Sequence, residues 1–148
     1  MRIISLFLFA CGSIGCGLEL PSPPPNIFYK YNELKVGKGP AYLITADLNL
    51  DGFPDLVSAN AKNNTLSVLM GKGDGTFRKT LTFPVASEPT TIATGDVNSD
   101  DIPDLLVNSR GTGQITILLG YGNGSFRRLP VVKTGKVPLA IIPADFNG

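Results

Sequence analysis

The sequence of 148 residues contains no histidine and no tryptophan. Without histidine, Ser-His-Asp and Cys-His catalysis, histidine-bound zinc and a histidine pH switch are all excluded. Without tryptophan, the propeller repeats that this residue defines are disfavoured. The chain also lacks an excess of either charge, because 13 Lys and Arg stand against 12 Asp and Glu. The resulting net charge of +1 gives no basic surface for nucleic acid, so we expect no nucleic-acid partner.

Cysteine is nearly absent, and both copies, Cys11 and Cys16, lie close to the N-terminus. No disulfide framework can therefore support a fold in the rest of the chain. Hydrophobic residues make up 43% of the sequence and charged residues 17%, which suffices for the core of one modest domain. The 17 glycines and 12 prolines indicate many turns.

Residues 1–16 have the pattern of an export signal, since Arg2 precedes a hydrophobic stretch over residues 3–10. This stretch is shorter than the roughly 20 residues that span a bilayer. The segment that ends at Cys16 resembles a bacterial lipoprotein box, which makes Cys16 the candidate for lipidation and Cys11 its alternative. Cleavage without lipidation and a retained anchor stay open. We therefore expect an exported protein, lipid-anchored in the cell envelope or extracellular, with membrane contact only through that anchor.

The rest of the chain repeats with a fixed period of 49 residues. Segments 41–89 and 90–138 align without a gap and share 14 identical positions, where chance predicts about three. Three sets of residues recur at this spacing: Asp47, Asp96 and Asp145; Phe28, Phe77 and Phe126; Pro40, Pro89 and Pro138. We expect the phenylalanines to be core anchors between neighbouring sheets and the prolines to begin strands. A period near 50 is typical of propellers, solenoids and arrays.

Each repeat is predicted to contain four short β-strands. Apolar segments with β-branched residues predict strands at 43–46, 56–59, 65–70 and 114–119. The pairs Asp74-Gly75 and Asn123-Gly124 mark tight hairpin turns. A fourth strand is expected to start at Phe77 and run toward Pro89. Because four strands are the content of one propeller blade, we expect an all-β fold of four-stranded antiparallel blades.

The repeat also predicts how the chain is organised. We expect an export signal at 1–16, a proline-rich linker at 17–27, a partial repeat at 28–40, full repeats at 41–89 and 90–138, and the truncated start of a third at 139–148. The linker should be extended and stiff, since it contains the run Pro21-Ser22-Pro23-Pro24-Pro25. Propellers usually close with about 4–8 blades. Two full units therefore predict an incomplete propeller and a fragment of a longer chain, with a short protein closed by oligomerisation as the alternative.

Acidic residues concentrate in one loop of each repeat, where eight of the 12 lie. Carboxylates packed this closely repel one another, so protonation or a cation must relieve the repulsion. Oxygen ligands at loop positions 1, 3, 5 and 9, with a carbonyl from position 7, suit calcium better than magnesium. The predicted ligands are Asp47, Asn49, Asp51, Asp55 and the carbonyl of Phe53; Asp96, Asn98, Asp100, Asp104 and the carbonyl of Ile102; and Asp145 and Asn147 of the third copy.

The two complete loops differ at their sixth position, which is Gly52 in the first and Asp101 in the second. The loop must turn sharply there, and aspartate tolerates left-handed backbone at some cost. The second site is therefore expected to bind more weakly unless its extra charge compensates. Neither loop continues as an EF-hand, because no glutamate stands at position 12. A solvated acidic turn whose side chains cap their own backbone is the alternative to a calcium site.

The segments Ala46–Val57 and Leu69–Phe77 resemble the FG-GAP/VCBS-type repeat, a family related to the blades of the integrin α-subunit propeller. The resemblance covers roughly residues 28–148. It implies calcium-binding β-propeller blades in exported proteins, generally used for adhesion or ligand binding. Asp101 departs from the family pattern, which has glycine at that position.

Together these features predict an exported, non-catalytic, calcium-binding module for a protein or glycan ligand that the sequence does not identify. An enzymatic reading pairs Asp51 with Asp55, or Asp100 with Asp104, for glycosidic chemistry. Those pairs recur in each repeat, whereas an active site is normally formed once per fold. Two further functions stay open: the repeat region of a larger hydrolase or lyase, and an architectural spacer.

Overall fold

The computed structural model describes residues 33–135 and 138–144. The chain divides into two units, Met1–Leu34 and Lys35–Gly148, and every strand named below belongs to the second. The predicted export signal with Cys11 and Cys16, the proline-rich linker, Phe28, Asp145 and Asn147 all lie outside the described residues. Across the described ranges, no helix is long and apolar enough to cross a membrane.

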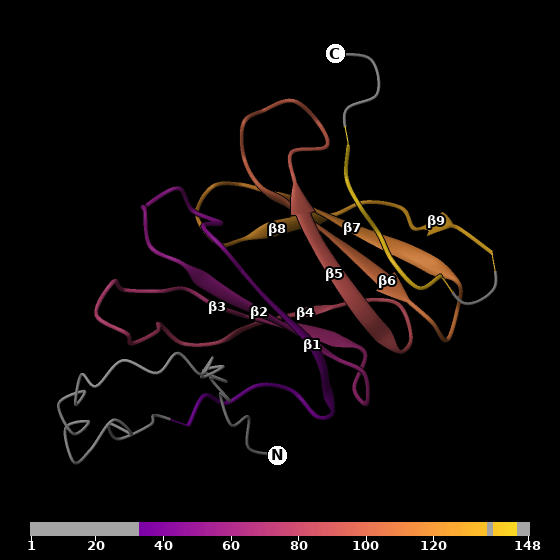
Figure 1. Cartoon of the computed structure of the whole chain (residues 1–148), viewed down its shortest axis with the longest axis horizontal. Helices are drawn as coiled ribbons and strands as arrows, with labels where there is room; N and C mark the ends of the chain where they lie inside the picture. Colours follow the sequence, from indigo (N-terminus) through magenta and orange to yellow (C-terminus); the bar gives the residue numbers. More distant parts are fainter. Residues whose placement is uncertain (1–32, 136–137, 145–148) are drawn as a thin grey trace, which may run out of the picture. The chain divides into compact units, whose positions relative to one another are not determined.

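Sheet 1 is antiparallel, with four strands in chain order (Figure 1). Its strands are β1 (Pro40–Ala46), β2 (Asp55–Asn60), β3 (Thr65–Leu69) and β4 (Leu81–Pro84). The strands predicted at 43–46, 56–59 and 65–70 are thereby confirmed. Val57 pairs with Val68 and Ala59 with Leu66, so these four apolar side chains share one face of the sheet.

Sheet 2 repeats this layout with an outer strand that is broken in two. Its strands are β5 (Pro89–Gly95), β6 (Asp104–Ser109), β7 (Gln114–Gly120), β8 (Phe126–Arg128) and β9 (Val132–Lys133). Both β8 and β9 pair with β7, so together they take the place that β4 has in sheet 1. The strand predicted at 114–119 is confirmed, and Pro40 and Pro89 each begin a first strand as expected.

The fourth strand of the first repeat differs from its prediction. It begins at Leu81 rather than at Phe77, and Phe77 forms only an isolated bridge with Gly71. The register of that bridge is one residue out of step with the pairing of Val68 and Leu81, so an extra residue lies between them. Such an insertion interrupts the ladder and increases the local twist. The same strand of sheet 2 is interrupted at the equivalent place, between β8 and β9.

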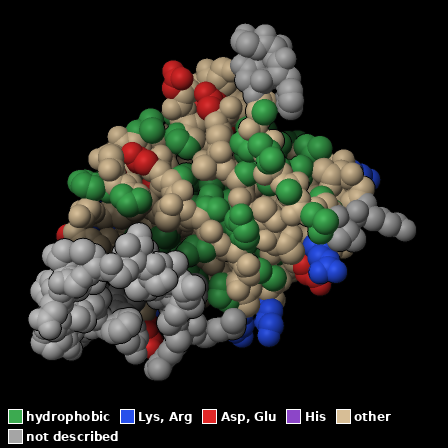
Figure 2. All heavy atoms as spheres, viewed as in Figure 1, with side chains coloured by type: hydrophobic (Ala, Val, Ile, Leu, Met, Phe, Trp, Pro, Cys, Tyr) green, Lys and Arg blue, Asp and Glu red, His purple; other side chains and the backbone are tan. Residues whose placement is uncertain are grey.

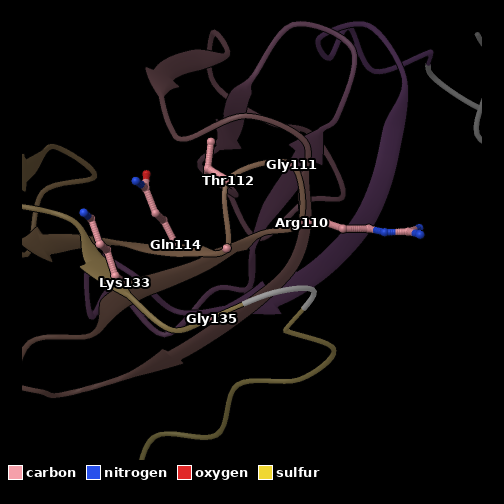
Figure 3. A pocket seen from close by; sticks show the side chains of 7 residues that line it. Arg110, Gly111, Thr112, Gln114, Lys133 and Gly135 are labelled. Carbon is pink, nitrogen blue, oxygen red and sulfur yellow. The ribbon is translucent and has the colours of Figure 1, made fainter.

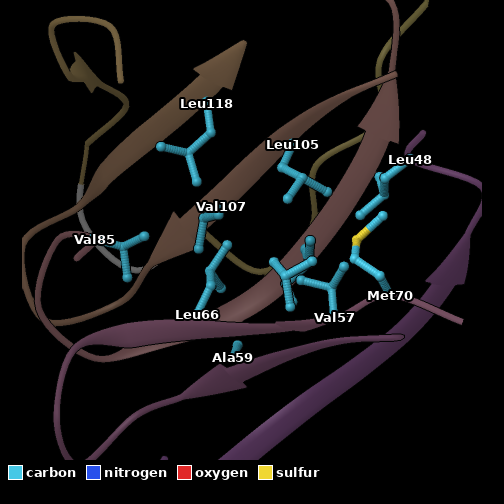
Figure 4. Packing of buried hydrophobic residues seen from close by; sticks show 11 residues of the cluster. Leu48, Val57, Ala59, Leu66, Met70, Val85, Leu105, Val107 and Leu118 are labelled. Atoms are coloured by element: carbon cyan, nitrogen blue, oxygen red, sulfur yellow. The ribbon is translucent and has the colours of Figure 1, made fainter. Parts of the chain in front are cut away.

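The hydrophobic core lies between the two sheets (Figure 4). Val57, Ala59, Leu66 and Val68 of sheet 1 and Leu105, Val107 and Leu118 of sheet 2 belong to one cluster and are at most 2% exposed. Burying each large aliphatic side chain contributes about 1.5–3 kcal/mol. The rings of Phe83 and Phe126 meet edge to face at the rim of this core, with centroids 5.3 Å apart. Phe126 is thus confirmed as a core anchor, whereas Phe77 is half-buried and lies outside the cluster.

The 49-residue period is visible in individual hydrogen bonds. Gly37 N donates to Ser67 Oγ at 3.1 Å, and 49 residues later Ala86 N donates to Thr116 Oγ1 at 3.2 Å. A second pair repeats in the same way: Ala61 N donates to the Gly39 carbonyl, and Arg110 N donates to that of Glu88. The described residues therefore form two successive antiparallel blades of β-propeller type that do not close a ring.

Candidate metal centres

Each acidic loop joins the first two strands of its sheet, and its first aspartate caps the loop backbone. Asp47 Oδ1 accepts a hydrogen bond from Asp51 N at 3.1 Å, and its Oδ2 accepts one from Gly52 N at 2.8 Å. In the second loop Asp96 accepts four N–H groups: those of Asn98, Ser99 and Asp100 on Oδ1, and that of Asp101 on Oδ2. The carboxylate at position 1 therefore organises the turn in both repeats.

Positions 3 and 5 contact each other in the same manner in both loops. Asn49 Nδ2 donates to Asp51 Oδ2 at 2.8 Å, and Asn98 Nδ2 donates to Asp100 Oδ2 at 2.8 Å. The remaining oxygen of each aspartate accepts the backbone N–H two residues later, from Phe53 at 3.0 Å in the first loop and from Ile102 at 2.9 Å in the second. The two loops thus share these side-chain hydrogen bonds, whereas the bond from Asp51 N to Asn49 Oδ1 at 3.3 Å occurs in the first of the two described loops alone.

The loop backbone enters the left-handed region at two positions rather than at one. The sixth position has φ of 82° at Gly52 and 63° at Asp101, in line with the sharp turn expected there. The fourth position also has positive φ, 58° at Leu50 and 60° at Ser99, which the sequence did not indicate. A leucine seldom adopts this conformation, so the surrounding hydrogen bonds must hold it in place.

The ninth position has a different role from the other predicted ligands. Asp55 is 0% exposed, and its two oxygens accept Leu48 N at 2.9 Å and Gly71 N at 2.7 Å. Asp104 is equally buried and accepts Val97 N at 2.9 Å and Gly120 N at 2.8 Å. Each carboxylate therefore ties its acidic loop to the end of the third strand.

The pKa values of two aspartates, one at the first position of the second loop and one at the ninth position of the first loop, are shifted in opposite directions. The pKa of Asp96 is lowered, chiefly because the N–H of Asp101 stabilises its carboxylate. The pKa of Asp55 is raised, chiefly by burial, with the nearby charges of Asp51 and Asp47 adding to the rise against its two backbone hydrogen bonds. The carboxylates of the first loop are therefore close enough to repel one another electrostatically.

No aspartate of either complete loop forms an ion pair with Lys or Arg within the described residues. Figure 2 shows acidic side chains toward the end of β5 where the second loop begins, while the Lys and Arg side chains visible in this view lie on the opposite side. Among the residues that the structure describes, no basic side chain therefore neutralises the charge of these loops through an ion pair.

Glycines of the hairpin after the third strand fit against the acidic loop, a contact that sequence reasoning missed. A Cβ at Gly71 would overlap the Pro54 carbonyl, and one at Gly73 would overlap the ring of Phe53. Gly120 packs equally closely on the Pro103 carbonyl. The available signal was the recurrence of these glycines at the 49-residue spacing, which a hairpin turn alone also explains.

The predicted ligands fall into two groups according to how exposed they are and how many of their oxygen lone pairs remain available to a cation. Asp47, Asn49 and Asp51, like Asp96, Asn98 and Asp100, lie at least partly exposed on their loops. Each carboxylate oxygen of these residues accepts one N–H group and keeps a lone pair, except Asp96 Oδ1, which already accepts three. Asp55 and Asp104 are buried, with both oxygens already accepting N–H groups. No three or more acidic, cysteine or histidine side chains of the described residues are arranged to hold a metal ion. The donor set fits calcium in chemistry, but the amide of Asn49 points a nitrogen at Asp51.

A surface hollow of about 600 Å³ lies away from the acidic loops (Figure 3). It is lined by the turn 110–114 between β6 and β7, by Lys133 and by Gly135. This turn is at the opposite end of β6 from the second acidic loop. Arg110 points away from the other labelled side chains, and the lining contains no carboxylate, so the hollow is not a cation site.

The fold and the loops define a class of protein, one that repeats a four-stranded blade with an acidic loop between its first two strands. A family model described as FG-GAP-like repeat matches residues 47–107 and 96–148. The chain belongs to the FG-GAP-like repeat family, which confirms the resemblance inferred from its motifs. No curated protein matches the chain.

Proposed function

We propose that this repeat protein is an exported, non-catalytic interaction module whose acidic loops bind calcium. The observation that carries the proposal is the duplicated donor set: the same carboxylates and amide, with the same bonds between positions 3, 5 and 7, and without a basic partner among the described residues. Repetition favours a structural ion over catalysis, because an active site is normally formed once. Hard oxygen donors of this kind select calcium among the common cations.

Calcium would be held in the first loop by Asp47, Asn49, Asp51 and the Phe53 carbonyl, and in the second by Asp96, Asn98, Asp100 and the Ile102 carbonyl. The amides of Asn49 and Asn98 would turn their oxygens toward the ion. Asp55 and Asp104 would contribute only through their remaining lone pairs, since their backbone bonds hold the loop to the hairpin. The ion would relieve the repulsion between carboxylates and stiffen each loop.

The exposed side chains at the end of the sheets that carries the acidic loops also support a role in binding. Large apolar side chains are exposed there beside the carboxylates, among them Leu50 at 58% and Tyr121 at 56%. Exposed apolar groups bordered by polar ones are typical of interaction surfaces. The ligand would be a protein or a glycan, and export would follow from the N-terminal signal with Cys16 as its lipidation site.

Thermal unfolding with and without calcium tests the central part of this proposal. Extracellular modules bind calcium with dissociation constants of about 0.1–1 mM. At 1 mM calcium and a constant of about 0.1 mM, each site would add about 1.4 kcal/mol to the free energy of unfolding. The expected result is a higher midpoint that a chelator reverses.

Asp51→Asn should lower the calcium-dependent rise, because it removes one carboxylate and keeps an oxygen for the Phe53 N–H. Asp74→Asn is the matched control, since Asp74 caps the hairpin at Thr76 outside the predicted ligand set. A midpoint that calcium leaves unchanged in the unmodified chain contradicts the proposal and supports a self-capped acidic turn.

A further inference from the structure

The hairpins that follow the third strand of each sheet share one backbone arrangement but differ in one side chain. Each turn is closed by a backbone hydrogen bond, which runs from Tyr121 N to the Ser125 carbonyl at 3.2 Å in the second hairpin. The middle position of the turn is Asp74 in the first hairpin and Asn123 in the second. The second hairpin therefore carries the dipeptide Asn123-Gly124, with a side-chain amide where the first hairpin has a carboxylate.

An asparagine that precedes a glycine is prone to deamidation, because glycine has no side chain to hinder the approach of its backbone nitrogen. In this reaction Gly124 N forms a bond to Asn123 Cγ, the bond from Cγ to the amide nitrogen breaks, and ammonia leaves with the proton that Gly124 N gives up. Water then opens the cyclic imide at one of its two carbonyls. Opening at Cγ gives aspartate, and opening at the backbone carbonyl gives isoaspartate, in which the main chain runs through the side chain. Neither step involves an oxidant or a reductant.

The folded hairpin leaves both reacting groups of this dipeptide available. Asn123 is exposed, and its equivalent Asp74 is exposed too although sheet 2 packs on sheet 1. The exposure therefore belongs to the hairpin itself. Gly124 N donates no hydrogen bond to any described residue, so the attacking nitrogen is not held in place.

The fold also requires the glycine of this pair. Gly124 has φ of 81°, and a Cβ there would lie 2.8 Å from the sulfur of Met70, which belongs to the core cluster (Figure 4). A side chain at this position would have to adopt left-handed backbone and displace Met70. The contact and the backbone conformation together keep a glycine directly after Asn123.

Hydrogen bonds within the turn slow the reaction. Asn123 Oδ1 accepts the Ser125 N–H at 2.9 Å and the Ser125 hydroxyl at 2.5 Å. The amide must leave these bonds before Cγ can turn toward Gly124 N. Because both bonds are neutral and lie on an exposed turn, water replaces them at small cost in free energy. They therefore restrain the amide without blocking the reaction.

The other asparagines of the described residues lack this combination of features. Asn98 is also exposed, but the nitrogen that follows it belongs to Ser99 and donates to Asp96 Oδ1 at 2.7 Å. The remaining five are buried or precede a residue with a larger side chain than glycine: Asn49, Asn60, Asn63, Asn64 and Asn108. Asn123 is thus the residue of this set that is best placed to react.

We propose that Asn123 is a site of spontaneous deamidation in the folded chain, with water as the co-reactant and ammonia as the released product. The aspartate product reproduces the first hairpin, where Asp74 Oδ1 accepts the Thr76 N–H at 2.9 Å and the Thr76 hydroxyl at 2.6 Å. The isoaspartate product adds one carbon to the main chain directly before Gly124 and so displaces the backbone that fits against Met70. This modification does not depend on calcium or on the proposed function.

The modified hairpin adjoins the second acidic loop. Gly120 N donates to Asp104 Oδ1 at 2.8 Å, and a Cβ at Gly122 would contact the side chain of Ile102. Deamidation therefore adds a negative charge to the hairpin that holds this loop, and the isoaspartate product also changes the path of its backbone.

Peptide mapping by mass spectrometry of the folded 148-residue chain, sampled during incubation in mildly alkaline buffer, tests the proposal. Cleavage after Lys and Arg releases peptide 111–127, in which Asn123 is the only asparagine. Its mass should rise by about 1 Da as the amide becomes a carboxylic acid, and the two products should separate by chromatography. Peptide 80–110, which contains Asn98 and Asn108, should change more slowly. The second Asn-Gly pair of the sequence, Asn147-Gly148, lies outside the described residues and is scored separately in peptide 137–148.

Variants of the hairpin show whether its own bonds control the rate. Ser125→Ala removes the hydroxyl that bonds Asn123 Oδ1 and should speed the conversion about fivefold, which corresponds to the loss of one neutral hydrogen bond. Thr76→Ala removes the equivalent hydroxyl of the first hairpin and is the matched control, which should leave the rate unchanged. Asn123→Asp should abolish the mass gain in peptide 111–127 and supplies the chromatographic standard for the aspartate product. Circular dichroism of every variant verifies that the strands are retained.

Three results would each overturn the proposal. The first is a peptide 111–127 that gains no mass in the folded chain while a synthetic peptide of the same sequence does. The second is a mass gain in peptide 80–110 as fast as that in peptide 111–127. The third is a rate at Asn123 that is the same in Ser125→Ala as in Thr76→Ala, which would mean that the reaction does not take place in the folded hairpin.

Discussion

The two acidic loops have nearly the same structure although they differ at the position where the turn should be most demanding. Gly52 in the first loop and Asp101 in the second both adopt left-handed backbone, and both N–H groups bond the first aspartate of their loop at 2.8 Å. A glycine at position 6 is therefore not what defines the turn. The carboxylates at positions 1 and 9 are common to both loops, and their hydrogen bonds account for the shared shape.

The largest expected effect comes from removing the buried carboxylate that both loops share. Asp55→Ala leaves the N–H groups of Leu48 and Gly71 buried without an acceptor. Each such group costs about 1–3 kcal/mol, so the free energy of unfolding should fall by about 2–6 kcal/mol. Denaturant unfolding measures this loss, and Asp104→Ala should reproduce it in the second repeat.

Asparagine would be a poor replacement at this position in spite of its shape, since its amide nitrogen would face one of the two N–H donors. Asp55→Asn should therefore destabilise the chain nearly as much as Asp55→Ala does. Glu88→Gln serves as the control, because Glu88 is an exposed acidic residue that lies outside both loops. A loss confined to one of the two repeats would contradict the equivalence of the loops.

A smaller effect is expected when the two residues that distinguish the loops, Gly52 and Asp101, are exchanged. Gly52→Asp should lower the free energy of unfolding by about 0.5–1 kcal/mol, because left-handed backbone costs aspartate more than glycine while the new Cβ meets no atom within 4 Å. Asp101→Gly should raise it by a similar amount. Both changes should leave the far-ultraviolet circular dichroism spectrum unaltered.

Calcium titration of the same two variants sharpens the comparison between the loops. If backbone strain limits the second site, Asp101→Gly should bind calcium more tightly than the unmodified chain. If the extra carboxylate attracts the ion, the variant should bind it more weakly. Equal shifts of opposite sign in the two variants would show that the residue, and not the rest of the loop, sets the difference in affinity.

Sequence patterns predicted the features that depend on neighbouring residues. Short apolar segments with β-branched residues located β2, β3 and β7, and the spacing of acidic residues located both loops, because each of these signals lies within the segment that it specifies. The tie between Asp55 and the hairpin was missed because its partner Gly71 is 16 residues away. The late start of β4 depends on a register shift against β3, which a single strand does not reveal.

The smallest expected effect concerns pH and the first aspartate of the second loop. Four N–H groups lower the pKa of Asp96 below its usual 3.8, so the unfolded chain takes up this proton at a higher pH than the folded chain does. The resulting stability is present above the unfolded pKa and is lost as the pH falls through the folded pKa. Asp55 acts in the opposite sense, because its raised pKa favours the folded state at low pH and this advantage declines as the pH rises.

The prediction is that Asp96→Asn reduces the dependence of unfolding free energy on pH between about pH 5 and about pH 2.5, where carboxylates titrate. Asparagine keeps an oxygen that can accept the N–H groups of Asn98, Ser99 and Asp100. Its amide nitrogen would face the Asp101 N–H, but this part of the loop is exposed, so water can accept that N–H and the turn should persist without the titrating charge. Denaturant unfolding at a series of pH values, with a chelator present throughout, measures the slope. Asp101→Asn is the control, because the Asp101 side chain accepts no hydrogen bond from any described residue. If both variants flatten the slope equally, the effect comes from the net charge of the loop and not from the hydrogen bonds to Asp96.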